Sequence, residues 1–391
     1  MKLIIKLVAG IVLGILIGLL APEWITKLLL TFKTLFGELL FFTIPLLILF
    51  YITSGIAGLP RNSGRMLGRT LGTAYLSTIL AGIVAFLIAA VVVPMLSATG
   101  APPPETNGEV LEPFIELEIP PIVGIMTALA TAFVFGLGIA ATGAETLKRV
   151  FDDGRDVIEK LLVVVIIPLL PFYIAGVFAE LAAAGTVFET LRTFGVVLAL
   201  SIALHWVWIS TLFTIAGLRA GRSPLGLIRN MLPAYFTALG TMSSAATIPV
   251  TLQSARKNKV RDEIASFTVP LCATTHLAGS TITIVACAVA VMVLQDGLAM
   301  PSLWGMLPFI LMLGIVMLAA PGVPGGAVMS AVALLTSMLG FGEAAIALMI
   351  ALYMAQDSFG TACNVTGDGA IAVMVDQAAA GDEPPGDGPP G

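Results

Sequence analysis

Long apolar stretches recur along the whole chain, and they restrict the classes of fold that it can adopt. Of the 391 residues, 58% are hydrophobic and 11% are charged, whereas an ordinary soluble domain has about a quarter charged residues. A transmembrane helix needs roughly 20 mostly apolar residues. The first half of the chain supplies suitable stretches at residues 3–20, 35–56, 71–95, 122–142, 157–181 and 194–218. The sequence therefore predicts an all-α polytopic membrane protein.

The first apolar stretch follows Lys2 and Lys6, as the core of a signal peptide would. It is long, no small-x-small cleavage site follows it in residues 21–24, and further spans come after it. We therefore expect a retained first helix and no soluble domain at either end. The compact loops and the lack of a targeting segment favour a bacterial or archaeal inner membrane.

Lys and Arg residues cluster in alternate connections, at residues 61–69, 148–155 and 219–229. Cytoplasmic loops carry an excess of positive charge, whereas the connection at 102–118 is acidic and rich in proline. This pattern predicts cytoplasmic N- and C-termini and a disordered acidic tail at residues 379–391. The charges form no basic face of the kind that a nucleic acid requires.

Two stretches in the second half of the chain interrupt apolar runs with Ser, Thr, Gly and Pro, at residues 240–249 and 320–326. Irregular backbone at membrane depth must be buried in protein or line a cavity. Paired interruptions of this kind point to the midplane binding site of a transporter.

The charges also constrain how the second half crosses the membrane. The basic groups at 219–229 and 256–261 can both be cytoplasmic only if the chain between them forms a re-entrant hairpin. Residues 264–294 then cross outward, 301–338 can form a second hairpin from outside, and 344–375 cross back. This arrangement predicts an inverted repeat, in which a hairpin and a broken helix occur twice.

Three motifs in this region resemble those of the dicarboxylate/amino acid:cation symporter family, which contains glutamate and neutral amino acid transporters. Ser243 and Ser244, followed by TIPVT at 247–251, look like the serine-rich tip of the family's first hairpin, and VPGG at 323–326 looks like the tip of its second. NVTGD at 364–368 matches the family's last-helix motif. The likeness in spacing and order covers nearly the whole chain, and in the first half it rests on hydropathy.

The resemblance implies a glutamate-transporter-like elevator fold of eight transmembrane helices and two re-entrant helical hairpins, assembled as a homotrimer in the lipid bilayer. Residues 1–70 and 118–190 would form a scaffold that holds the subunits together. Residues 71–97 and 191–378 would form a transport domain that carries a small amino acid across the membrane.

Two acidic residues of the last helix, Asp357 and Asp368, are eleven residues or about three turns apart, so they share roughly one face. A carboxylate at membrane depth costs about 2.5–3.5 kcal/mol on insertion scales, so each needs a partner or a function. By resemblance, Asp357 receives the ammonium group of the substrate, Asn364 binds its α-carboxylate, Asp368 is an ion ligand, and Thr361 lies near the substrate. The alternative is a pair of protonated or internally bonded carboxylates.

Backbone N–H groups at Ser243, Ser244 and Gly325 could cradle an anionic carboxylate, as the N-termini of helices do, or these could be turn residues only. A hydrolase that uses Ser243 or Ser244 with His276 is a competing class. No GxSxG or HExxH motif accompanies these residues, so we expect neither an enzyme nor catalytic residues. Saturable exchange of labelled substrate would distinguish a transporter from a hydrolase or an open pore.

Family members that take acidic substrates have an arginine in the last helix at the position of Gly360, and some relatives keep one at the first hairpin tip, where this chain has Met242. Bidentate recognition of a carboxylate depends on such a guanidinium group. Its absence favours a neutral substrate such as serine, alanine or threonine, in a small pocket near Ser280, Gly360 and Thr361. The alternative is a conventional sodium-coupled symporter of acidic amino acids or dicarboxylates.

The family's sodium-site motif, Asn-Met-Asp-Gly-Thr, is replaced by His-Leu-Ala-Gly-Ser at residues 276–280. The replacement removes an amide, a thioether and a carboxylate, whereas a hard cation such as sodium requires oxygen ligands. An alignment of the third span places Ala81 and Gly82 where hydroxyl ligands are expected. Asn364 and Asp368 would retain only part of a sodium site. We therefore expect weak or absent sodium coupling, no other metal and no cofactor.

Three further residues bear on ion coupling and packing. Thr274 could offer a backbone carbonyl to the residual sodium site. His276 suggests proton coupling, because imidazole ordinarily changes its charge between pH 5 and 8 and Asp368 is close to this position in the family fold. The alternative is a neutral, hydrogen-bonded histidine that fills the vacated cation space. We expect His205 to be an interfacial or packing residue.

Overall fold

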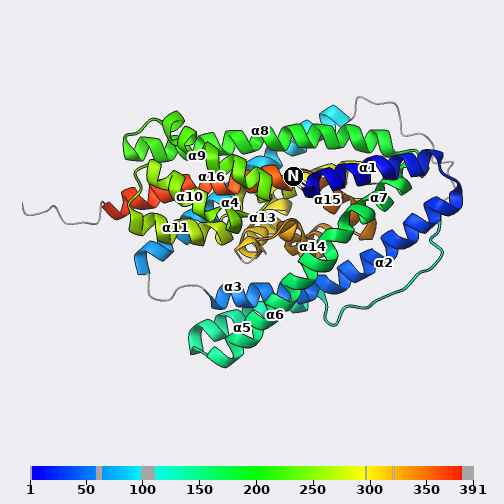
Figure 1. The fold of residues 1–391 in the computed structure, drawn as a ribbon, viewed down its shortest axis with the longest axis horizontal. Coiled ribbons are helices and arrows are strands. Elements are labelled where there is room, and N and C mark those ends of the chain that lie inside the picture. The colour runs from blue at the N-terminus through cyan, green and yellow to red at the C-terminus, as the bar shows by residue number, and fades with distance from the viewer. Residues whose placement is uncertain are drawn as a thin grey trace, which may run out of the picture.

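The computed structural model describes residues 2–58, 64–97, 111–295, 297–318, 320 and 322–380 (Figure 1). The predicted acidic connection up to residue 110 and the tail from residue 381 lie outside the described residues. Every regular element in the described ranges is helical, which confirms the all-α prediction. In chain order the elements are α1 (Lys2–Leu20), α2 (Glu23–Leu47), η1 (Ile48–Ile52), α3 (Thr53–Ala57), α4 (Gly64–Ser97), α5 (Ile125–Thr142), α6 (Glu145–Leu161), η2 (Leu162–Ile166), α7 (Ile167–Ala183), α8 (Val187–Ala220), α9 (Pro224–Thr241), α10 (Ser244–Lys257), α11 (Asp262–Thr275), α12 (Ala278–Leu294), α13 (Leu303–Met317), α14 (Gly326–Leu339), α15 (Glu343–Met354) and α16 (Asp357–Ala380).

Several of these helices are long and apolar enough to cross a membrane. Within the described part of the chain they are Glu23–Ala57, Arg65–Leu96, Glu145–Ala183, Val187–Ala220 and Asp262–Leu294. Helices α15 and α16 form a further span if they are counted together, with a bend of 60° between them. The protein is therefore a multi-pass membrane protein, while the count of eight spans and two hairpins stays a prediction.

Two spans begin about three turns earlier than their apolar stretches predict. The helix predicted at 35–56 begins at Glu23, and the one predicted at 157–181 begins at Glu145. The added part of the second helix, α6, carries charges such as the Lys148–Asp152 pair at a spacing of one turn, which supports a helix without adding hydropathy. A window of apolar residues detects only the membrane-embedded part of such a helix.

Helix α1 lies unusually close to α7 because one face of α1 carries glycines at every fourth position. A Cβ atom added at Gly10, Gly14 or Gly18 would lie within 2.4 Å of a backbone carbonyl oxygen of α7. Small residues at this spacing allow the backbones of membrane helices to approach. The outer face of α1 carries exposed apolar side chains such as Ile5 and Leu20, as a lipid-facing surface would.

The helices form two packing groups. The first group contains α1, α2, α3, α5, α6 and α7, which pack mainly on one another. The second group contains α4 and the helices from α8 through α16, and within it α4 packs mainly on α12. In Figure 1, α9, α10 and α11 lie at one end of the molecule, and α2 and α7 extend toward the other. Helix α16 contacts α8, α9, α11 and α12, so its side chains face the interior of the second group.

The predicted interruptions form the tips of two helix pairs. Helix α9 ends at Thr241 and α10 begins at Ser244, while α13 ends at Met317 and α14 begins at Gly326. Two longer helices are also broken, between α11 and α12 and between α15 and α16. Leu277, in the first of these breaks, is buried in protein, as irregular backbone at membrane depth must be.

Candidate functional site

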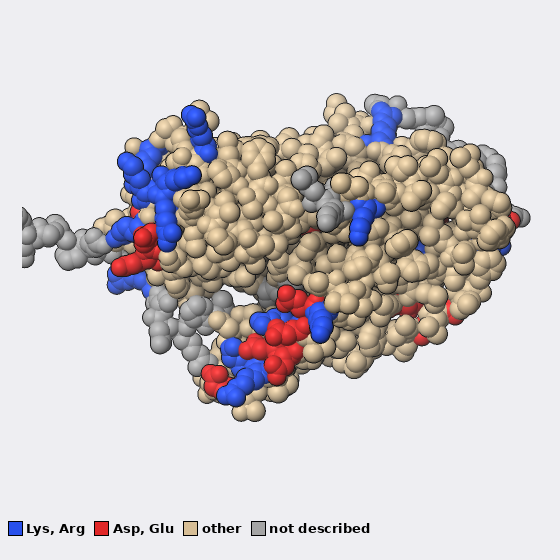
Figure 2. All heavy atoms as spheres, viewed as in Figure 1, with Lys and Arg blue, Asp and Glu red and all other residues tan. Residues whose placement is uncertain are grey.

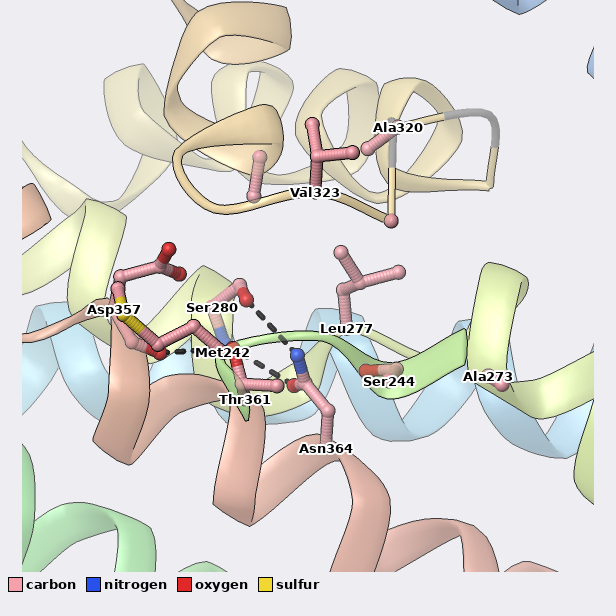
Figure 3. Close-up of a pocket in the computed structure, with 12 residues that line it drawn as sticks. Met242, Ser244, Ala273, Leu277, Ser280, Ala320, Val323, Asp357, Thr361 and Asn364 are labelled. Carbon is pink, nitrogen blue, oxygen red and sulfur yellow. Dashed lines mark hydrogen bonds between the residues drawn. The ribbon is translucent and has the colours of Figure 1, made fainter. Parts of the chain in front are cut away.

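A small cavity lies where the two hairpin tips face the break between α11 and α12 and the start of α16 (Figure 3). Its described lining is apolar or hydroxyl-bearing apart from an asparagine and one ionisable side chain, Asp357. The lining residues are Met242, Ser244, Ala273, Leu277, Ser280, Ala320, Gly322, Val323, Ala327, Asp357, Thr361 and Asn364. A site of this kind offers one negative charge and no positively charged side chain.

The two hairpin tips close this cavity. Ser243 Oγ donates to the carbonyl oxygen of Gly322 at 2.9 Å and accepts from the N–H of Ala246 at 3.2 Å, so it caps α10 and does not line the cavity. Leu277 points toward the second hairpin tip, which carries Val323 (Figure 3). The cavity measures about 20 Å³, which accommodates about one water molecule. An amino acid is larger, so a tip must move before a substrate can enter.

Met242 shapes the first hairpin tip. It ends α9 with a φ of +55°, in the left-handed region, and its N–H donates to the carbonyl oxygen of Ala238 at 2.8 Å. A side chain other than glycine in this region costs about 1–3 kcal/mol, and such strain collects at binding and switch sites. The buried side chain of Met242 lines the cavity at the position where an arginine is absent.

Asp357 is held by two donors from its own chain. Its Oδ2 accepts from the N–H of Gly325 at 2.8 Å, and its Oδ1 accepts from the hydroxyl of Tyr353 at 2.9 Å. Gly325 has a φ of +76°, and a Cβ there would lie 2.7 Å from Met354 Sδ, so only glycine fits. The N–H predicted to cradle the carboxylate of a substrate thus serves the carboxylate of Asp357 in this closed state.

Asn364 supports the first turn of α12. Its Oδ1 accepts from the N–H groups of Gly279 at 2.7 Å and Ser280 at 3.2 Å, and its Nδ2 donates to Ser280 Oγ at 2.9 Å. Leu277 precedes this helix without a side-chain cap of its own, so Asn364 supplies the cap from α16. One N–H of the Asn364 amide remains for a ligand at the cavity wall.

Gly360 faces away from the cavity. A Cβ added there would lie 3.3 Å from Thr283 Oγ1 and 3.4 Å from the backbone nitrogen of Ser280, and Gly360 is not among the lining residues. Gly279 opposes it, because a Cβ at Gly279 would lie 2.4 Å from the carbonyl oxygen of Gly360. Of the three residues predicted to form a small side-chain pocket, Ser280 and Thr361 line the cavity, whereas Gly360 allows α12 and α16 to cross closely.

The two predicted threonines lie in different places. Thr361 lines the cavity, and its Oγ1 donates to the carbonyl oxygen of Asp357 at 2.9 Å. Thr274 is exposed, and its Oγ1 donates to the carbonyl oxygen of Leu271 at 3.0 Å. The structure thus brings Ser244, Ser280, Asp357, Thr361 and Asn364 together, and leaves Thr274, Ser243 and Gly360 outside the lining.

A second polar cluster lies one to three turns further along α16. His276 Nδ1 is 2.9 Å from Asp368 Oδ1, and His276 Nε2 is 2.9 Å from Ser77 Oγ on α4. Trp208 Nε1 on α8 donates to the same Ser77 oxygen at 3.2 Å. A Cβ at Gly367 would lie 2.6 Å from His276 Cε1, so this glycine makes room for the imidazole.

The directions of these bonds follow from the fixed donors. Since Trp208 donates to Ser77 Oγ, the hydroxyl proton of Ser77 is free to point at His276 Nε2. The other ring nitrogen of His276 then donates to Asp368 Oδ1. A protonated ring would instead donate from both nitrogens, with the Ser77 proton turned away, so the cluster has acceptors for either state.

The third span contributes a hydroxyl group to this cluster from a position other than Ala81 and Gly82. Ser77, one turn before the expected Ala81, contacts His276, whereas Gly82 faces Ile310 and Thr281. The oxygen atoms described in this cluster are a poor fit for a sodium ion. Asp368 Oδ2 has no hydrogen-bond partner, but Oδ1 is bonded to the imidazole and Asn364 Oδ1 accepts two N–H groups. In addition, the side chain of Ala278 carries no oxygen.

Several contributing residues were not found from the sequence. Tyr353 precedes the bend before α16, and Ser77 and Trp208 come from helices far apart in the chain. His205 is buried, and its Nε2 lies 3.0 Å from the carbonyl oxygen of Gly279 and 3.1 Å from Thr283 Oγ1. It is a packing residue that holds α12, and the interfacial alternative is wrong.

Comparison with known proteins identifies the family of the chain. The family model described as "Sodium:dicarboxylate symporter family" matches residues 3–378. The chain is 28% identical to excitatory amino acid transporter 1 of Ambystoma tigrinum over 260 residues, which are 65% of this chain and 47% of that protein. It is 26% identical to excitatory amino acid transporter 1 of Homo sapiens over 255 residues, 64% of this chain and 46% of that protein. The chain thus spans about half the length of the curated relatives that it matches. With these matches and the motifs at the hairpin tips and on α16, the chain belongs to the sodium:dicarboxylate symporter family, a family of membrane transporters and not of enzymes.

Proposed function

We propose that this protein is a secondary active transporter of a small neutral amino acid, in which sodium coupling is weakened or lost and the His276–Asp368 pair binds a proton in its place. The observation that carries the substrate class is the cavity lining. Asp357 supplies one negative charge, and no Lys, Arg or His is among the described residues that line the cavity.

The lining favours a substrate with an ammonium group and an uncharged side chain. An ammonium group would pair with Asp357, and the remaining amide N–H of Asn364 is available to the α-carboxylate. The carboxylate of an acidic side chain would lose its water in this cavity without gaining a cation. The free-energy cost of burying such an unpaired charge is far larger than that of burying a neutral side chain. The apolar side chains of Met242, Leu277 and Val323 suit a short side chain such as that of alanine, serine or threonine.

The His276 cluster supports the change of coupling ion. His276 stands where the family's sodium-site motif has an asparagine. Its ring contacts Asp368 Oδ1 directly, and both side chains are buried. A protonated imidazole would supply at Asp368 the positive charge that a bound cation supplies elsewhere in the family. The groups that face His276 are Asp368 from α16, Ser77 from α4 and the Gly367 backbone, so Asp368 is its ionisable neighbour among the described residues.

The two packing groups support an elevator mechanism. Residues 1–70 and 118–190 would form the scaffold of a homotrimer, and residues 71–97 and 191–378 would move as the transport domain. The cavity, both hairpin tips and the His276 cluster all lie within the second group, so they would move as one body. The cytoplasmic position of both termini and the inner membrane of a bacterium or archaeon stay predictions from the charge pattern.

The test is a thermal-shift panel of amino acids on the purified protein, in choline buffer and in sodium buffer of the same ionic strength. A ligand that binds the folded state raises its melting temperature by mass action. Stabilisation by alanine, serine or threonine in both buffers supports the proposal. Stabilisation by aspartate alone, and only in sodium, would show a conventional sodium-coupled acidic amino acid transporter.

A further inference from the structure

A positively charged groove lies at the end of the molecule where α9, α10 and α11 meet, far along the chain from the cavity residues of α16. Figure 2 shows Lys and Arg side chains gathered at this end. The groove has a volume of about 490 Å³ and runs between the turn from α8 to α9 and the turn from α10 to α11. Four of its lining residues are cationic: Arg222, Arg229, Lys257 and Lys259.

No acidic side chain is among the described residues that line this groove. Two acids near the groove are already paired, because Asp262 bonds Arg256 at 2.8 Å and Asp376 bonds Arg261 at 2.8 Å, and the exposed Glu263 is not among the lining residues. Within the described ranges, Arg229, Lys257 and Lys259 have no ion-pair partner. The groove therefore collects positive charge that the protein does not neutralise.

The walls of the groove are fixed by a buried asparagine. Asn258 Nδ2 donates to the carbonyl oxygen of Leu227 at 3.1 Å, and Asn258 Oδ1 accepts from Asn230 Nδ2 at 2.8 Å. Arg222 Nη1 donates to the carbonyl oxygen of Asn258. These bonds tie the start of α9 to the end of α10, so the cations are held around a preformed hollow. The N-terminus of α9 opens into the same hollow at Gly226, which adds the positive end of a helix dipole.

Exposed apolar side chains lie on α8 and α9 within two turns of the groove residues. Leu218, one turn before Arg222 on α8, is 77% exposed, and Phe236, two turns after Arg229 on α9, is 63% exposed. A ligand that fills the groove with an anionic group can therefore lay apolar chains against these side chains. The charge pattern of the chain predicts that this end is cytoplasmic, where anionic headgroups meet basic residues.

We propose that this groove binds the phosphate of an anionic phospholipid, with the acyl chains along the exposed apolar residues of α8 and α9. Phosphate oxygens accept from Arg222, Arg229 and the two lysines together, and the open side of the groove leaves room for the glycerol group. This site is separate from the substrate cavity and does not depend on the proposed substrate or coupling ion.

The experiment measures lipid binding to the purified full-length protein by native mass spectrometry. The probes are dioctanoyl phosphatidylglycerol, dioctanoyl phosphatidylcholine and inorganic pyrophosphate. The groove variant is Arg229→Gln/Lys257→Gln. The control variant, Arg149→Gln/Lys160→Gln, removes the same charge from exposed positions on α6. A basic residue near an anionic lipid contributes about fivefold in affinity, so two independent contacts contribute about 25-fold.

The wild type and the control variant should bind phosphatidylglycerol saturably, and the groove variant should bind it about 25-fold more weakly. Equal weakening in both double variants would overturn the proposal, because general surface charge would then explain the binding. Equal affinity for phosphatidylcholine would also overturn it, and pyrophosphate binding as tight as that of phosphatidylglycerol would show a site for a free anion. If the groove variant aggregates, Lys259→Gln tests the same groove with an expected loss of about fivefold.

Discussion

Replacing Asp357 by asparagine should weaken substrate binding strongly while the cavity stays in place. In the closed site both carboxylate oxygens accept hydrogen bonds, Oδ1 from Tyr353 and Oδ2 from the N–H of Gly325. An amide has a single acceptor oxygen, so one of these donors would face an NH₂ group. The variant also loses the one negative charge of the cavity lining, which the ammonium group of the substrate needs.

The magnitude follows from the charge of the lost acceptor. A hydrogen bond to a charged group contributes about 1.5–3 kcal/mol. At about 1.4 kcal/mol for each factor of ten, its loss weakens binding by about 10- to 150-fold. The matched control, Tyr353→Phe, keeps the charge of the Asp357 carboxylate and removes a bond within the protein, so it should weaken binding less than Asp357→Asn does.

Isothermal titration calorimetry of L-alanine and L-serine with each purified variant measures these affinities, and the melting temperature without ligand reports whether each variant is folded. The expected order is a large loss for Asp357→Asn and a smaller one for Tyr353→Phe. If a folded Asp357→Asn variant binds within threefold of the wild type, or if Tyr353→Phe binds more weakly than it does, Asp357 does not receive the ammonium group.

Four further substitutions test other parts of the structure. Met242→Arg places a guanidinium at the cavity wall and should raise aspartate affinity by tenfold or more in the same calorimetric titration; no gain would show that this side chain does not reach the substrate. Gly360→Arg should instead lower the melting temperature without admitting aspartate, because the position packs on α12; a stable variant that binds aspartate would contradict this placement. His276→Gln keeps hydrogen-bonding groups but cannot titrate, so the rate of amino acid exchange between pH 5.5 and 8 should become flatter than in the wild type; an unchanged pH profile would mean that His276 is a structural residue. Gly14→Val should destabilise the fold by about 1–3 kcal/mol or more through contact with the Ala175 carbonyl, and unchanged thermal unfolding would refute the close α1–α7 packing.

Local composition was enough to locate the irregular segments of the fold. Residues 240–249 combine Gly, Pro and hydroxyl residues and residues 320–326 are rich in Gly and Pro, which end helices, and in the structure α9 and α13 end at these stretches. The start of the helix at Glu145 could not be found in this way, because its first turns are amphipathic and charged. Hydropathy reports burial in lipid, whereas the helix itself depends on spacing and on pairs such as Lys148–Asp152.

The site could be predicted where its residues belong to a motif within one helix. Asp357, Thr361 and Asn364 share a face of α16 and reach the cavity together. Partners from other helices could not be predicted, because Ser77 and Trp208 belong to no motif and meet only after α4 and α8 have packed. The surroundings of Gly360 could not be predicted for the same reason, since the direction in which a side chain at this position would point depends on the crossing of α12 and α16.

The central claim is that the protein moves a neutral amino acid without requiring sodium. Counterflow of radiolabelled L-serine or L-alanine into proteoliposomes tests it directly, with choline replacing sodium on both sides at constant ionic strength and pH. The account predicts saturable exchange in choline at a rate within about threefold of that in sodium, and no competition by excess aspartate. Exchange that occurs only in sodium, or that aspartate abolishes, would contradict it.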